Sequence, residues 1–124
     1  MIRSIPKEGI QIKLAQIERL AIVDIRSTEE YEKAHLPHAF SIPLTSLQKE
    51  AHSYIPDLGS EVVVYANDSR SPQAELAAQI LKGVGYFNVY CYWGGLADWA
   101  ESGLPVDGVY QPFDATKHPH LKAA

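Results

Sequence analysis

Three short runs of β-branched and apolar residues constrain the fold of this chain more than any other feature. They span residues 21–25, 61–65 and 88–92, and each is followed by a polar loop and then by a helical pattern. Such runs are typical of strands buried on both faces, and their alternation with helices predicts a parallel sheet with helices on both faces. The fold class is therefore α/β, and a site is expected at the carboxyl ends of the strands.

Capping signals predict where the first helices begin. Ser27 and Glu30 have the spacing of a capping box, in which each side chain accepts a hydrogen bond from the other residue's backbone N–H. Thr45 and Gln48 repeat that spacing, which predicts a helix over about residues 46–53.

Two further helices follow the second and third runs. The first is expected to begin with Ser71 as its cap and Pro72 at its first position, and to end at Gly83 or Gly85. Gly103 is expected just past the second. The predicted apolar stripe of the first of these helices consists of Leu76, Ala77, Ile80, Leu81 and Val84.

Composition bounds the class of protein. With 124 residues, a single domain is expected over residues 1–108, followed by a loosely ordered, polar tail over residues 109–124. The net charge of −4 argues against nucleic acid or an anionic membrane as the partner. No apolar stretch reaches the roughly 18 residues of a membrane helix, and no signal peptide is recognised, so a cytoplasmic location is expected.

The order of several motifs resembles that of single-domain rhodanese-like proteins, which have the sulfurtransferase fold. The matching segments are residues 23–26, 30–31, 35–39, 42–44, 63–65, 85–89, 94–95, 99 and 103–106. The resemblance covers roughly residues 10–107. It implies a rhodanese-like fold and a site in the loop after the second run.

The resemblance also implies a reaction, in which a cysteine directly after that strand takes sulfur from a donor such as thiosulfate and holds it as a persulfide. Ala66 stands at or next to that position, and no residue from 61 to 90 is cysteine. The expected ligand-binding loop consists of Ala66, Asn67, Asp68, Ser69, Arg70 and Ser71. Asp68 disfavours an anionic ligand there. Arg70 either contacts a bound anion or pairs with Asp68.

Other candidate site residues have a structural alternative. Cys91, the single cysteine, is either a relocated sulfur-carrying thiol or a small buried hydrophobe. Arg26, Trp93 and Gly94 are expected at the rim of the pocket, whereas Asp24 is expected to be structural. Ser69 and Ser71 have no histidine in the loop to serve as their base.

Metal binding is not expected. His35 and His38 are separated by Leu36-Pro37, and His118 and His120 have no companion ligand at zinc spacing. No cofactor is expected either.

Two functions remain open. The first is a rhodanese-like domain, inactive in sulfur transfer, that binds a protein partner or a small anionic ligand through the loop or acts as a regulatory module. The second is a sulfurtransferase-type enzyme that uses Cys91 or a partner's cysteine. The missing cysteine favours the first.

Overall fold

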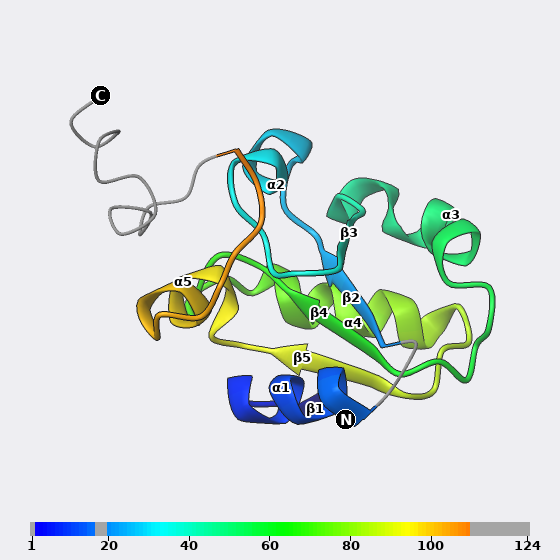
Figure 1. Cartoon of the computed structure of the whole chain (residues 1–124). Helices are drawn as coiled ribbons and strands as arrows, with labels where there is room; N and C mark the ends of the chain where they lie inside the picture. Colours follow the sequence, from blue (N-terminus) through cyan, green and yellow to red (C-terminus); the bar gives the residue numbers. More distant parts are fainter. Residues whose placement is uncertain (1, 17–19, 110–124) are drawn as a thin grey trace.

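A five-stranded parallel sheet forms the centre of the molecule (Figure 1). The computed structural model describes residues 2–16 and 20–109. The strand order is β1-β5-β4-β2-β3. The strands are β1 (Arg3–Ser4), β2 (Ala21–Asp24), β3 (Ala39–Ser41), β4 (Val62–Tyr65) and β5 (Val89–Tyr92). The predicted α/β class and the central parallel sheet are confirmed.

The register of the three central strands brings their carboxyl ends together. Asp24 is paired with Tyr65, and Tyr65 is paired with Tyr92. The segments that leave these strands therefore emerge side by side, as expected for a parallel sheet. All four residues of β4 are fully buried, because helices cover both faces of the sheet.

The described residues also form five helices. They are α1 (Lys7–Gln16), α2 (Thr28–Lys33), α3 (Leu44–Tyr54), α4 (Gln73–Gly83) and α5 (Gly95–Glu101). Side chains of α3 and α4 pack in the core on one face, and those of α1 and α5 pack in the core on the other. Helix α2 buries none of its residues and lies near the carboxyl end of β2.

Several local signals are confirmed. Ser27 and Glu30 form the complete capping box of α2. Gly85 and Gly103 have left-handed backbones with φ of 114° and 81° just past α4 and α5. After α4, the N–H of Tyr86 donates to the carbonyl of Leu81, which is the bond that closes a Schellman motif.

Other local predictions are wrong in detail. Helix α3 begins at Leu44 without a side-chain cap, so the spacing of Thr45 and Gln48 does not make a capping box. Helix α4 begins at Gln73 after Pro72, and the Ser71 hydroxyl bonds to Asp68 instead of capping the helix.

The predicted stripe of α4 is wrong in part. Ala77 and Leu81 are buried as expected, but Leu76 and Val84 are exposed. Small residues replace them against the sheet, because the remaining buried positions of the helix are Ala74 and Ala78. The sequence reasoning did not predict β1 or α1. The predicted tail lies outside the described residues except for Val109, and so do His118 and His120.

Candidate functional site at the loop after β4

The loop that follows β4 is fastened to the start of α5. Ala66 is 4% exposed, and its carbonyl accepts a hydrogen bond of 3.0 Å from the N–H of Leu96. The carbonyl of Asn67 accepts one of 2.8 Å from the N–H of Ala97. Two N–H groups at the start of α5 are therefore used by the loop and are not directed at a ligand.

Gly95 permits this close approach. Its φ is 67°, and a Cβ atom there would lie 2.5 Å from the carbonyl oxygen of Ala66. A side chain at this position would collide with the backbone of the loop and would also strain its own backbone. The second glycine of the Gly94-Gly95 pair is thus needed to seat the loop on α5.

A buried ion pair supports the base of the site. The Arg26 guanidinium holds the Asp24 carboxylate through two bonds, Nε to Oδ1 at 2.9 Å and Nη2 to Oδ2 at 2.6 Å. The Tyr65 hydroxyl donates to Asp24 Oδ2 at 2.6 Å and accepts from the N–H of Leu36 at 3.0 Å. Arg26 Nη2 also donates to the Ala34 carbonyl at 2.6 Å. This network ties β2, β4 and the end of α2 together directly beneath the loop.

The environment of this network fixes its protonation. Burial alone would lower the pKa of Arg26, but the hydrogen bonds and charge of Asp24 outweigh burial, and the pKa is raised. Burial, together with the charge of Asp24, raises the pKa of the Tyr65 hydroxyl far above its ordinary value. Tyr65 therefore stays a hydrogen-bond donor. Because the Arg26 guanidinium is occupied by Asp24 and by backbone carbonyls, its role is structural and it offers little charge to a ligand.

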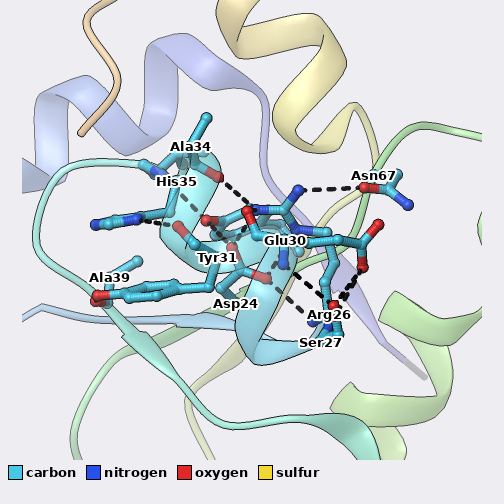
Figure 2. A network of polar contacts seen from close by, with 11 residues as sticks. Asp24, Arg26, Ser27, Glu30, Tyr31, Ala34, His35, Ala39 and Asn67 are labelled. Atoms are coloured by element: carbon cyan, nitrogen blue, oxygen red, sulfur yellow. Dashed lines mark hydrogen bonds and ion pairs between the residues drawn. The ribbon is translucent and has the colours of Figure 1, made fainter. Parts of the chain in front are cut away.

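Asn67 connects the loop to this network. Figure 2 shows Asn67 reaching the Arg26 guanidinium, and Arg26 Nη1 donates to Asn67 Oδ1 at 3.3 Å. The Asn67 side chain also lowers the pKa of the Glu30 carboxyl group. Burial would raise the pKa of Glu30, but hydrogen bonds from Ser27 and Asn67 outweigh it and lower that pKa. Asn67 thus positions the loop more than it offers a group to a ligand.

The centre of the loop is organised by Asp68. Its Oδ1 accepts hydrogen bonds from the N–H of Arg70 at 3.0 Å and from the Ser71 hydroxyl at 3.4 Å. Arg70 Nη2 lies 3.7 Å from Asp68 Oδ2, and the Arg70 side chain is 90% exposed. The structure therefore contains the pairing with Asp68 that was the structural alternative for Arg70. His35 is engaged elsewhere, because its ring stacks on Tyr31 and its Nδ1 contacts the Tyr31 carbonyl.

Cys91 lies in the core and not in the loop. It is fully buried in β5, where it is paired with Val64 on one side and Ser4 on the other. Burial, assisted by the charge of Glu75, raises the pKa of its thiol to about 12. The side chain has the position of a small hydrophobe, which was the structural alternative for this residue.

Two of the expected rim residues, Arg26 and Trp93, each line a cavity. Arg26 lines a cavity of about 290 Å³ between α2 and α5, whose walls include Leu96, Ala100 and Val106. Trp93 lines a different cavity of about 430 Å³ beside α4. Gly94 is the residue before α5, and it has no room for a side chain because Asp98 packs against it.

Sequence reasoning missed the role of Tyr65. A tyrosine at the end of a fully buried strand carries a hydroxyl that needs a partner, and Asp24 ends the neighbouring strand. That signal could have found the contact.

Within residues 2–16 and 20–109, no group of three or more histidine, cysteine, aspartate or glutamate side chains gathers as a metal site would. None of the helices in this part of the chain has the length and apolar character needed to cross a membrane.

Comparison with known protein families identifies the class. The family model described as rhodanese-like domain matches residues 10–102. The chain therefore belongs to the family of rhodanese-like domains, as the motifs had suggested.

Curated relatives agree with this assignment. The chain is 34% identical over 99 residues to YrkF of Bacillus subtilis, which covers 77% of this chain and 51% of that protein. It is 31% identical over 106 residues to a sulfurtransferase of Allochromatium vinosum, covering 86% of this chain and 95% of the relative. It is 36% identical over 78 residues to the thiosulfate sulfurtransferase PspE of Escherichia coli, covering 63% and 72%. The chain thus spans about half of the first of these relatives and most of the other two.

Solved structures show the same architecture. A rhodanese from E. coli, solved with anions, is 32% identical with a TM-score of 0.62, covering 73% of this chain and 99% of that one. A protein from Bacillus halodurans has a TM-score of 0.77 at 24% identity, covering 86% and 77%. At that identity the second likeness supports the fold alone.

Proposed function

We propose that this chain is a rhodanese-like binding or regulatory module that engages a partner through residues 66–71 and forms no persulfide of its own. The proposal rests on the positions of two residues, Ala66 and Cys91. Alanine directly follows β4, where the resemblance calls for the nucleophile, and the single cysteine of the chain is buried on another strand. A cytoplasmic location stays a prediction from the sequence.

The chemistry of the thiol supports this proposal. Sulfur transfer requires a thiolate that can reach the donor. At pH 7, a thiol with a pKa of about 12 is ionised in a fraction on the order of 10⁻⁵. Cys91 is also fully buried, so a donor the size of thiosulfate has no path to its sulfur without opening of the core.

The loop supports a binding role. Ser69 and Arg70 are exposed, while α5 holds the loop backbone and Arg26 holds the Asn67 side chain. An exposed set of polar groups on a fixed backbone is suited to recognition of a partner, because little ordering entropy is lost on binding.

The runner-up is a sulfurtransferase-type enzyme that uses Cys91 or a cysteine of a partner. The names of the Allochromatium and E. coli relatives, both sulfurtransferases, favour it. In the version with a partner's cysteine, the loop would surround a thiolate that another chain supplies.

A thiocyanate assay tests the proposal. The purified protein and its Cys91→Ser variant are incubated with thiosulfate and cyanide, beside an active rhodanese as a control for the reagents. The proposal expects no thiocyanate above the protein-free rate from either form. Thiocyanate that the wild type forms and the variant does not would replace the proposal with the Cys91 enzyme. Activity that appears only when a cysteine-containing partner is added would favour the other version of the runner-up.

A further inference from the structure

Asp68 carries a carboxylate that is turned back into its own loop. Its Oδ1 accepts from the backbone N–H of Arg70 and from the Ser71 hydroxyl, at 3.0 and 3.4 Å. Its carbonyl accepts from the N–H of Ser71 at 3.0 Å. Three donors of the loop are therefore satisfied by a single residue of the same loop.

Asp68 lies in the loop between β4 and α4. The donors that its carboxylate accepts from, the Arg70 N–H and the Ser71 hydroxyl, are groups that an oxyanion in this loop would use. The other helix that meets the loop, α5, directs the N–H groups of Leu96 and Ala97 at the carbonyls of Ala66 and Asn67. The carboxylate of Asp68 thus supplies the negative charge of this loop from within the chain.

The surrounding cations do not cancel that charge for a ligand. Arg26 is bound to Asp24 through two bonds. Arg70 faces Asp68 at 3.7 Å, but it is 90% exposed, and ion pairs of this kind are weak because solvent screens them. A small oxyanion entering the loop would meet a carboxylate, and it would also have to displace that carboxylate from the Arg70 N–H.

We infer that Asp68 is the specificity-determining residue of the loop, and that its carboxylate occupies the donors a small oxyanion would need and so closes the loop to such ligands. The inference rests on the proposed binding function, and it narrows the ligand from a protein partner or a small anion to a protein partner.

Titration with sulfate and thiosulfate, followed by the amide NMR signals of residues 66–76 at constant ionic strength, tests the inference. Asp68→Ala removes both the charge and the acceptor, whereas Asp68→Asn removes the charge and keeps an acceptor oxygen. Asp57→Ala is the matched control, because Asp57 Oδ1 accepts from the N–H two residues ahead, that of Gly59, at 2.9 Å, in an exposed loop before β4.

The wild type and Asp57→Ala are expected to show no saturable shifts. The Kd of Asp68→Ala for the oxyanions is expected to be at least about tenfold lower than the lower bound on Kd that the wild-type titration gives. The Kd of Asp68→Asn is expected to lie between these two values. Wild-type binding as tight as that of Asp68→Ala, or no binding by Asp68→Ala, would overturn the inference. Equal binding by the Ala and Asn variants would overturn the claim that the carboxylate blocks the donors. These binding results do not depend on the thiocyanate assay, so failure of the proposed function and failure of this inference are distinguishable.

Discussion

Replacing Tyr65 by phenylalanine should destabilise the protein much more than the removal of one hydroxyl usually does. The Tyr65 hydroxyl donates to the Asp24 carboxylate at 2.6 Å and accepts from the buried N–H of Leu36 at 3.0 Å. A bond to a charged group contributes about 1.5–3 kcal/mol, and a buried N–H left without an acceptor costs about 1–3 kcal/mol. Because the two effects arise at one site and are not additive, we expect the free energy of unfolding to fall by about 3 kcal/mol in total.

Tyr86→Phe provides the matched control. Tyr86 is also buried, but its hydroxyl donates to a neutral acceptor, the carbonyl of Ile55. Its removal should cost about 1 kcal/mol. Urea unfolding at neutral pH measures both variants, with an unchanged m-value required for the comparison. A loss for Tyr65→Phe that is no larger than the loss for Tyr86→Phe would refute the claim that Tyr65 is a central member of the network beneath the loop.

Three further perturbations test other parts of the account. Ala66→Cys should give weak thiosulfate:cyanide activity at best, because Asp68 disfavours the anionic donor; robust activity would contradict that electrostatic argument. Gly95→Ala should lower the free energy of unfolding in urea by more than about 2 kcal/mol, because the added Cβ would collide with the loop backbone. Gly83→Ala should not lower it, because an added Cβ there has no atom within 4 Å. The pKa of Glu30 is lowered from 4.5, so the contribution of its carboxylate to folding stability is present above pH 4.5 and is lost as the pH falls below that value. Glu30→Gln should therefore flatten the acid side of a plot of folding stability against pH. An unchanged acid side would count against the contacts that lower the pKa of Glu30.

The predictions that succeeded depend on residues close in sequence. The capping box of Ser27 and Glu30 and the helix ends at Gly85 and Gly103 each involve partners within a few residues. The pairing of Asp68 with Arg70 is likewise local. Runs such as residues 62–65 identify buried strands because nothing polar interrupts them.

The features that were missed depend on distant partners. Half of the residues of helix α1 are polar, and Ile10 is its one fully buried side chain. Its Lys13 is paired with Glu61, the residue just before β4. Asn67 contacts Arg26 from 41 positions away, so no local pattern reveals it. The stripe of α4 was misassigned because the sheet lies so close that alanines, and not Leu76 or Val84, fill the interface.

Direct detection of sulfur on the protein is the sharpest test of the central claim, that the loop binds without forming a persulfide. The intact mass of the native protein would be recorded after incubation with thiosulfate and with a low-molecular-weight persulfide, and compared with that of Cys91→Ser. We expect no added sulfur on the native wild type, because Cys91 is buried and its pKa is raised to about 12. Addition of one sulfur atom to the native wild type, absent from Cys91→Ser, would contradict the account.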